Sequence, residues 1–198
     1  MLRKLIQAAI SISIVLSLLA IAMILVGHDQ SEPQLFKVLH LCDGMPCYLE
    51  VAPGKTTWDS ALTIYEDAPG MAFDPNTNIA ANPPGYNGSN ILLDVEQGSP
   101  IVGGIVLDIR STDVSVGSLV LQFGSPCSVN VDELPNTQIL MYDSGMEVLV
   151  FTSDLDAGFL KPTTPVFKIN LFGNLTSCSP LSSIYRSQRW KGFVRYTN

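Results

Sequence analysis

An uncharged apolar run near the N-terminus constrains this chain more than any other feature. The run extends from Leu5 to Val26, and its few polar members are Gln7, Ser11, Ser13 and Ser17. As a helix, these 22 residues would span roughly 30 Å, which is the thickness of the hydrocarbon layer of a bilayer. The run therefore predicts a transmembrane helix over residues 5–26.

The charges beside the run predict its orientation. Arg3 and Lys4 precede it, and the next lysine or arginine is Lys37. Because cationic flanks stay in the cytoplasm, we expect a single-pass protein in the cell membrane, with a cytoplasmic N-terminus and an extracytoplasmic C-terminal domain. The alternative is a signal peptide cleaved after Ala22, within an A-x-A pattern, although the run exceeds the usual signal core of about 7–15 residues. Either outcome leaves the domain outside.

The remaining length and charge limit what the domain can be. A chain of 198 residues holds one anchor and one ordinary domain. We expect a cytoplasmic tip and anchor over 1–27, a juxtamembrane stalk over 28–41 and an extracytoplasmic α+β domain over 42–198. Without Arg3 and Lys4 the chain has nine basic and 18 acidic residues. Such a surface repels phosphate, so we exclude nucleic acid as a partner.

Cysteine usage fits an oxidising compartment. The four cysteines all follow the apolar run: Cys42, Cys47, Cys127 and Cys178. Three pairings are open. We favour a short loop between the first two, because Gly44 and Pro46 permit a tight turn, and a long-range link between the last two. In the chain-entropy model the long link contributes about 4 kcal/mol. A redox pair is the functional alternative, but the spacing is C-x4-C and not C-x-x-C, which favours a structural disulfide.

Two short helices are predicted by caps and apolar stripes. The first follows Thr56 and Thr57, and its stripe is Trp58, Ala61, Leu62 and Tyr65. The second follows the cap Ser115 and stops at Gly124, and its stripe is Val116, Leu119, Val120 and Phe123.

Alternating apolar residues predict several strands. They lie near 91–95, 105–109, 127–131, 139–142, 146–152 and 167–171, and the tail is a candidate for a further strand. Gly103 and Gly104 suggest a bulge in the second of these strands. Asp143-Ser144-Gly145 predicts a hairpin turn, and residues 71–90 are predicted to form a long loop. The sequence thus predicts an α+β fold of antiparallel sheets with two short helices behind the anchor. A duplicated helix-plus-hairpin unit, over 53–110 and 112–171, is an open alternative to a single non-repeating arrangement.

No catalytic signature is present. The only histidines, His28 and His40, lie beside the membrane and in the stalk, so neither is well placed for a triad or a zinc site. Asp94, Glu96 and Asp108 lie on or beside the first hairpin and could form a carboxylate pair for glycoside hydrolysis. More simply, they form the solvated face of a sheet. We expect no catalytic residue, no metal and no cofactor.

The C-terminal stretch has the most unusual local composition. It gathers four aromatic and four basic residues: Tyr185, Arg186, Arg189, Trp190, Lys191, Phe193, Arg195 and Tyr196. Aromatic residues and arginine are enriched at interface hot spots, so this stretch is a candidate interaction surface. The simpler alternative is a last strand whose cations pair with the acidic body.

Several segments carry a resemblance. Pro46-Cys47-Tyr48, the run Pro53 to Thr57, Ala61, the segment Leu119–Pro126 and the hairpin Tyr142–Phe151 resemble uncharacterised, membrane-anchored bacterial extracytoplasmic proteins. More distantly, the turn–helix–hairpin units look like outer-membrane-assembly lipoproteins of the SmpA/OmlA type and the duplicated β-lactamase-inhibitor fold. That resemblance implies a protein-binding module with short helices on an antiparallel sheet.

The functional expectation follows from location and exclusion. We expect a membrane-anchored extracytoplasmic module that binds a protein partner or acts as an envelope scaffold, and is not an enzyme. The alternatives are an enzyme that acts on cell-wall or glycan substrates through sheet carboxylates, and a structural subunit of a membrane complex.

Overall fold

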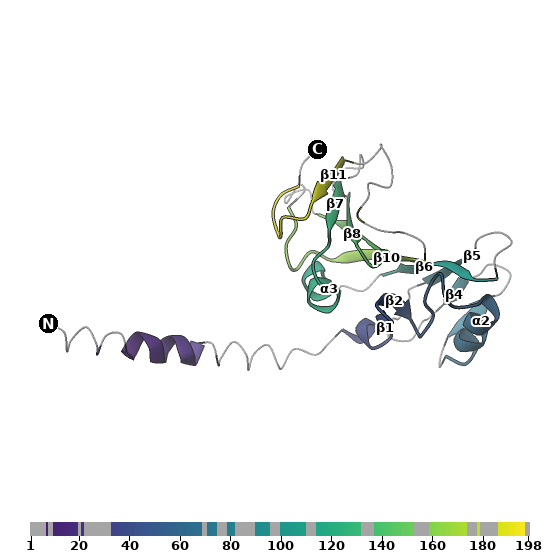
Figure 1. The fold of residues 1–198 in the computed structure, drawn as a ribbon, viewed down its shortest axis with the longest axis horizontal. Coiled ribbons are helices and arrows are strands. Elements are labelled where there is room, and N and C mark those ends of the chain that lie inside the picture. Colours follow the sequence, from purple (N-terminus) through teal and green to yellow (C-terminus); the bar gives the residue numbers. More distant parts are fainter. Residues whose placement is uncertain are drawn as a thin grey trace. The chain divides into compact units, whose positions relative to one another are not determined.

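The computed structural model (Figure 1) describes residues 7, 10–19, 21, 33–68, 71–74, 79–81, 90–95, 100–109, 114–131, 137–152, 159–173, 178 and 186–196. The chain divides into two compact units, Met1–Glu32 and Pro33–Asn198. In the first unit residues 10–19 are helical, and the Ser11 hydroxyl donates a hydrogen bond to the Gln7 carbonyl at 3.0 Å. Over the described part of the chain, no helix is both long enough and apolar enough to cross a membrane.

The second unit is built on one large antiparallel sheet, which confirms the predicted α+β class. Within the described residues this sheet has nine strands in the order β11-β7-β8-β9-β10-β6-β5-β4-β3. A separate hairpin pairs β1 with β2. The strands are β1 (Leu39–Cys42), β2 (Met45–Tyr48), β3 (Ala72–Asp74), β4 (Ile79–Ala81), β5 (Asn90–Val95), β6 (Val102–Asp108), β7 (Ser128–Val131), β8 (Thr137–Tyr142), β9 (Met146–Phe151), β10 (Val166–Phe172) and β11 (Arg186–Arg189).

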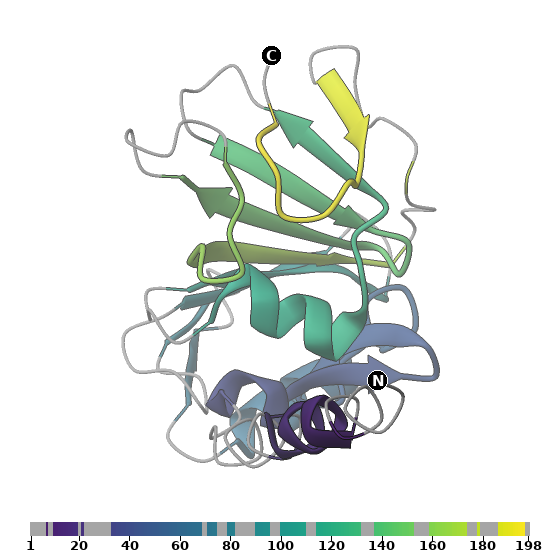
Figure 2. The same cartoon turned by 90° about the vertical axis from the view of Figure 1, so that its left-hand side faces the viewer.

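The sheet contains two runs of elements with the same order. In the first run, helix α2 (Trp58–Glu66) precedes β3 to β6, and in the second, helix α3 (Val116–Phe123) precedes β7 to β10. The last strand of each run, β6 and β10, pair with each other at the middle of the sheet. The two four-strand meanders therefore extend from this pair in opposite directions (Figure 2).

Each helix begins beside the start of the last strand of its own run. The N-cap residues Thr57 and Ser115 form isolated bridges with Ile101 and Pro165, each of which directly precedes that strand. Equivalent backbone hydrogen bonds flank the two bridges. Beside the Thr57 bridge, Trp58 N donates to Pro100 O at 2.7 Å and Val102 N to Thr56 O at 3.0 Å. Beside the Ser115 bridge, Val116 N donates to Thr164 O at 2.9 Å and Val166 N to Val114 O at 3.0 Å.

The helix boundaries follow the predicted caps. The Thr57 hydroxyl accepts a hydrogen bond from Ser60 N at 3.4 Å, and Ser115 forms a reciprocal capping box with Ser118. Such caps satisfy backbone N–H groups that lack a partner within the helix. Helix α3 ends at Gly124, whose φ of 83° is a conformation that favours glycine.

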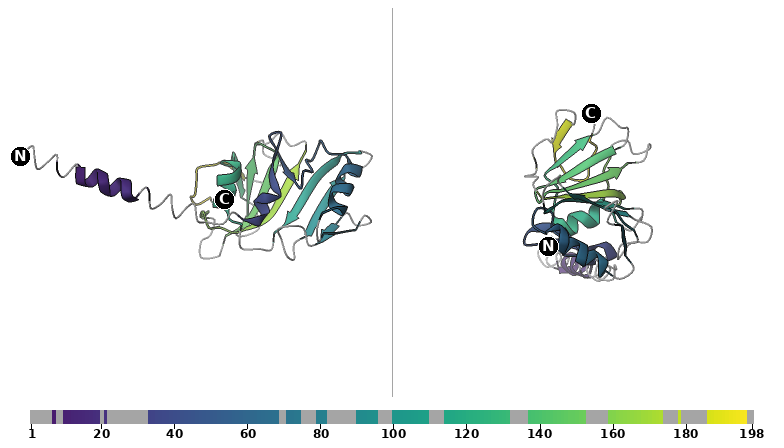
Figure 3. Two further views of the ribbon diagram at one scale, coloured as in Figure 1. Left: turned by 90° about the horizontal axis from the view of Figure 1, so that it is seen from below. Right: turned by 90° about the vertical axis from the view of Figure 1, so that its right-hand side faces the viewer.

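Both helices cover the same face of the sheet, and the N-terminal part of the domain fills the space between them. In the 3-10 helix η1 (Gln34–Lys37), the Phe36 ring lies 6.1 Å from that of Phe123 in α3. The ring of Tyr48 in β2 lies 6.4 Å from that of Tyr65 in α2. Figure 3 (left) shows η1 and the β1–β2 hairpin between the two helices. These side chains join the hydrophobic core that the sheet contributes from its inner face.

Two parts of the chain differ from the sequence prediction. The folded domain begins at Pro33, so part of the predicted stalk over 28–41 belongs to it. Leu35 and Leu39 are buried there, because they belong to the hydrophobic core. The predicted loop over 71–90 contains β3 and β4, strands of three residues each, which are too short to show an alternating pattern.

The predicted disulfides are confirmed. Cys42 pairs with Cys47 across the β1–β2 hairpin, and Cys127, which precedes β7, pairs with Cys178. The bridges close 5 and 51 residues of chain respectively.

The contact between Gly54 and Gly173 gives a stability prediction. A Cβ on Gly173 would overlap the backbone of Pro53 and Gly54. We expect Gly173→Ala to lower the free energy of unfolding by about 2–3 kcal/mol, because backbone cannot move aside as a side-chain tip can. Urea unfolding measures this. The control is Gly124→Ala, whose added Cβ meets no atom within 4 Å. We expect it to lower the free energy of unfolding by only about 1 kcal/mol, because alanine is less favourable than glycine at positive φ. An equal loss in both variants would contradict the close contact.

The two disulfides give a second prediction. Loop-closure entropy grows with the length of chain closed, so Cys127→Ser/Cys178→Ser should cost about 4 kcal/mol and Cys42→Ser/Cys47→Ser about 2 kcal/mol. Urea unfolding of both double variants measures the two losses in the free energy of unfolding, and the loss for the long bridge should be about twice that for the short one. If the short bridge costs as much as the long one, the chain-entropy account does not hold for this domain.

Candidate binding surface

The pairing register identifies the outer face of the sheet, the face opposite the helices. Ile169 and Leu171 of β10 pair with Leu107 and Ile105 of β6, and all four side chains are buried in the core. Since side chains alternate along a strand, the residues between them, such as Asn170 and Val106, face the other way. None of the described helices covers that side.

Two phenylalanines project from this outer face. The rings of Phe151 in β9 and Phe167 in β10 meet edge to face, with centroids 4.9 Å apart. Phe151 is 44% exposed and Phe167 41% exposed. Leu92 in β5, which pairs with Val106, is 41% exposed on the same face. We refer to Phe151 and Phe167 as the outer aromatic pair.

A bulge in β10 places Phe167 on this face. Val166 pairs with Val150 and Lys168 with Leu149, so Phe167 has no partner of its own in β9. An extra residue in one strand shifts the alternation of side chains by one position. The sequence predicted one alternating set of Phe167, Ile169 and Leu171. The structure corrects this, because the last two are fully buried and Phe167 is not.

A cavity of about 410 Å³ lies beside the outer aromatic pair. It is lined by Phe151, Thr152, Phe159, Lys161, Thr163, Thr164 and Pro165. Thr164 Oγ1 accepts a hydrogen bond from Lys161 N at 2.9 Å, which fixes the turn at its rim. The rings of Phe151 and Phe159 supply apolar surface, and the threonine hydroxyl groups and the Lys161 ammonium supply polar contacts. Such a lining suits an apolar group that also carries a hydrogen-bonding or anionic substituent.

A carboxylate is buried on the same face. Glu147 of β9 is 9% exposed, and Asn170 Nδ2 donates a hydrogen bond to its Oε2 at 3.2 Å. Burial raises the pKa of Glu147, and the hydrogen bond from Asn170 opposes that rise. The environment therefore favours the neutral carboxylic acid more than water does.

The described aromatic residues of the C-terminal stretch, Trp190, Phe193 and Tyr196, pack against one another. Tyr196 is buried, its ring stacks on Trp190 at 6.0 Å, and Phe193 meets Trp190 edge to face at 5.6 Å. The Tyr196 hydroxyl accepts a hydrogen bond from Lys191 N at 2.7 Å and donates one to Gly192 O at 3.0 Å. This network rigidifies the end of the chain.

The cations of that tail are placed differently. Arg189, Lys191 and Arg195 are exposed, and Arg186 belongs to β11, where it pairs with Val131. Tyr185 lies outside the described residues. In the described part of this stretch, Tyr196 is thus buried, and three basic side chains lie at the surface.

Two of the candidate sheet carboxylates belong to paired strands. Asp94 pairs with Gly104, and Asp108 pairs with Asn90. Four residues of strand separate the two pairs, which corresponds to roughly 13 Å along the backbone. Glu96 lies outside the described residues.

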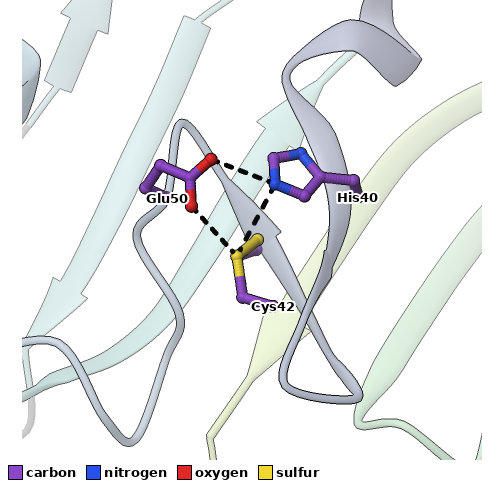
Figure 4. A group of neighbouring side chains, drawn as sticks. His40, Cys42 and Glu50 are labelled. Atoms are coloured by element: carbon purple, nitrogen blue, oxygen red, sulfur yellow. Dashed lines mark hydrogen bonds and ion pairs between the residues drawn. A yellow bond between two sulfur atoms is a disulfide. The ribbon is translucent and has the colours of Figure 1, made fainter.

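The β1–β2 hairpin gathers polar groups around its disulfide (Figure 4). His40 Nε2 lies 3.1 Å from Glu50 Oε1 and 3.7 Å from Cys42 Sγ, and Glu50 Oε2 lies 3.6 Å from the same sulfur. Because a disulfide sulfur carries no proton, it donates no hydrogen bond to Glu50. The sequence analysis missed this group, since it assigned His40 to the stalk. The spacing of His40 and Cys42, two residues apart, could have indicated that the two side chains share one face of a strand.

The raised pKa of Glu147 gives a prediction. A carboxyl group whose pKa rises on folding stabilises the domain below its unfolded pKa, and that contribution is lost as the pH rises through the folded pKa. We therefore expect the stability of Glu147→Gln relative to wild type to increase as the pH rises from about 4. Urea unfolding across pH 4–8 measures this, with exposed Glu66→Gln as the control. A relative stability that is independent of pH would contradict the burial argument.

The chain was compared with protein families, curated sequences and solved structures. No protein-family model and no curated protein sequence matches the chain. Among solved structures, a DUF4309 family protein (YjgB) from Bacillus subtilis is similar, at 13% sequence identity and a TM-score of 0.42. The match covers 73% of this chain and 99% of that one.

Proposed function

We propose that this chain is a membrane-anchored extracytoplasmic binding module that recognises another protein through the outer face of its sheet. The observation that carries the proposal is the outer aromatic pair, two rings in mutual contact that are 44% and 41% exposed. Large aromatic side chains bury much apolar area on binding, and exposed apolar groups of this kind mark interaction sites. The pair is held by two central strands, so it is presented on a rigid support.

The cavity beside the pair suggests the chemistry of the partner. Its volume of about 410 Å³ accommodates one large side chain between Phe151 and Phe159. Three threonines and Lys161 line the same cavity and supply hydrogen bonds to polar groups around such a side chain. The proposed partner is therefore a polypeptide segment that inserts an aromatic or long aliphatic residue. Interface hot spots of this kind combine a pocket with a polar surround.

The proposed location rests on two features. The apolar run over 5–26 has cations only on its N-terminal side, which favours a cytoplasmic N-terminus. The folded domain holds two disulfides, which persist in oxidising compartments. Anchoring would keep the outer face close to other envelope proteins and raise the effective concentration of a membrane-bound partner.

We further propose that the two runs of the domain derive from one duplicated helix-plus-strands unit. Support comes from the two N-cap bridges, Thr57 to Ile101 and Ser115 to Pro165, which occupy equivalent places. The hydrogen bonds that flank them are also equivalent. A duplicated fold provides a wide sheet with one open face, which suits recognition of a protein surface.

Site-specific photocrosslinking tests the binding proposal. The photoreactive amino acid p-benzoylphenylalanine replaces Phe167 in the full chain, expressed in its native cells. We expect one dominant adduct with a protein, because the probe would lie in the interface. The control position is Leu121 on α3, which is 89% exposed. It is an apolar site on the helix side that is more accessible than Phe167, so accessibility alone would favour labelling there.

Three outcomes decide the proposal. An adduct from position 167 that is absent at 121 and lost in the Phe151→Ala background supports it. Equal labelling at both positions, or no protein adduct from 167, overturns it. Far-UV circular dichroism of Phe151→Ala verifies that the variant is folded.

A further inference from the structure

We propose that the β1–β2 hairpin is a redox-gated metal site, which takes a Zn²⁺ ion when the Cys42–Cys47 disulfide is reduced. The donors are the two thiolates, His40 Nε2 and the Glu50 carboxylate, whose ligand atoms all lie within 4.8 Å of one another. Nitrogen and sulfur donors with one carboxylate are a set that Zn²⁺ prefers, and four donors complete its tetrahedral shell.

Two of the existing distances already match a tetrahedral shell. Zinc–ligand distances of about 2.0–2.3 Å place neighbouring donor atoms roughly 3.3–3.8 Å apart. Cys42 Sγ lies 3.7 Å from His40 Nε2 and 3.6 Å from Glu50 Oε2, so two edges of the tetrahedron are in place. The other Glu50 oxygen, Oε1, lies 3.1 Å from His40 Nε2, which keeps the carboxylate beside the imidazole. The Cys47 sulfur has to separate from its partner.

The hairpin places these donors on one face. His40 and Cys42 are two residues apart on β1, and Cys47 of β2 pairs directly with His40. Since side chains alternate along a strand, all three project to the same side. The Cα atoms of the two cysteines are 5.7 Å apart, so separating their sulfurs needs side-chain rotation and no movement of the strands.

A strained turn delivers the fourth donor. Leu49 and Glu50 have φ values of 49° and 64°, a left-handed conformation that non-glycine residues seldom adopt. This two-residue turn lies between Tyr48 and Val51, which exchange hydrogen bonds at 3.0 and 3.1 Å. It returns the Glu50 carboxylate to the face that holds His40. Backbone strain of this kind is concentrated at functional sites.

The hairpin does not depend on its disulfide for its shape. Its backbone pairs over four register positions, and Leu49 N donates a hydrogen bond to Val38 O at 2.8 Å. The core packing of Tyr48 and Leu39, both buried, anchors the two strands. The donors therefore stay in place after reduction.

The chemistry balances as two steps. A dithiol reductant passes two electrons and two protons to the disulfide, so its own sulfurs form a disulfide while Cys42 and Cys47 become thiols. Zn²⁺ then displaces one proton from each thiol, and the two thiolates, the imidazole nitrogen and the carboxylate bind the ion. The side chains of His40 and Glu50 are 34% and 72% exposed, so the ion enters from solvent on their side.

Cobalt titration of the full chain tests the proposal. The protein is reduced with a phosphine, freed of reductant under anaerobic conditions and titrated with Co²⁺. We expect one equivalent to produce the ligand-field absorption of tetrahedral Co²⁺ with a thiolate-to-cobalt band, and Zn²⁺ to displace it. The oxidised protein should show neither signal.

Variants assign the donors. His40→Ala and Glu50→Gln should each weaken Co²⁺ binding by about tenfold or more, whereas Asp43→Asn, which alters an exposed carboxylate in the same hairpin, should leave the affinity unchanged. Cys42→Ser should abolish the two-thiolate band. The proposal is overturned if the reduced wild type gives no thiolate band, if the band persists in Cys42→Ser, or if His40→Ala and Glu50→Gln bind like wild type. Circular dichroism of each reduced sample verifies folding.

Discussion

The pairing of β6 with β10 is the interaction on which the rest of the domain depends. These two strands end the two runs of the chain, and their antiparallel register of five residue pairs joins both meanders into one sheet. The register also sets which side chains face the helices. Leu107 opposite Ile169 and Ile105 opposite Leu171 are buried. Burial of apolar area therefore fixes this register, because a slip of one strand by one residue would move its two core side chains to the outer face.

Much of the fold could be predicted because its signals are local. The capping residue Ser115 and the stop at Gly124 defined α3, and Gly145, with a φ of 82°, marked the turn between β8 and β9. The cysteine pairing was favoured among three because Gly44 and Pro46 permit a tight turn between Cys42 and Cys47. The strands β1 to β4 and the helix η1 escaped prediction, because elements of three or four residues carry little periodicity by which to distinguish them from loop.

The candidate binding surface could not be predicted, since it depends on pairing between distant strands. The sequence placed Phe167 in the same alternating set as Ile169 and Leu171, and only the bulge opposite Val150 and Leu149 moves it to the outer face. Gly44 indicated the Asp43-Gly44 turn, where the φ values are 51° and 80°. The position of Glu50 beside His40 depends on a second left-handed turn, at Leu49 and Glu50, which contains no glycine and so could not be predicted from the sequence.

The two bulges of the sheet link the architecture to the proposed binding surface. In the first run Val95 pairs with Val102 and Asp94 with Gly104, so Gly103 is the extra residue. It is the second residue of β6, as Phe167 is of β10. One structural position is therefore occupied by glycine in one run and by an exposed aromatic side chain in the other. A glycine serves the bend alone, whereas an exposed phenylalanine adds apolar area that the bend does not require. Because the two positions share the same geometry, the fold alone does not explain the difference between them, and the partner recognition that we propose would account for it.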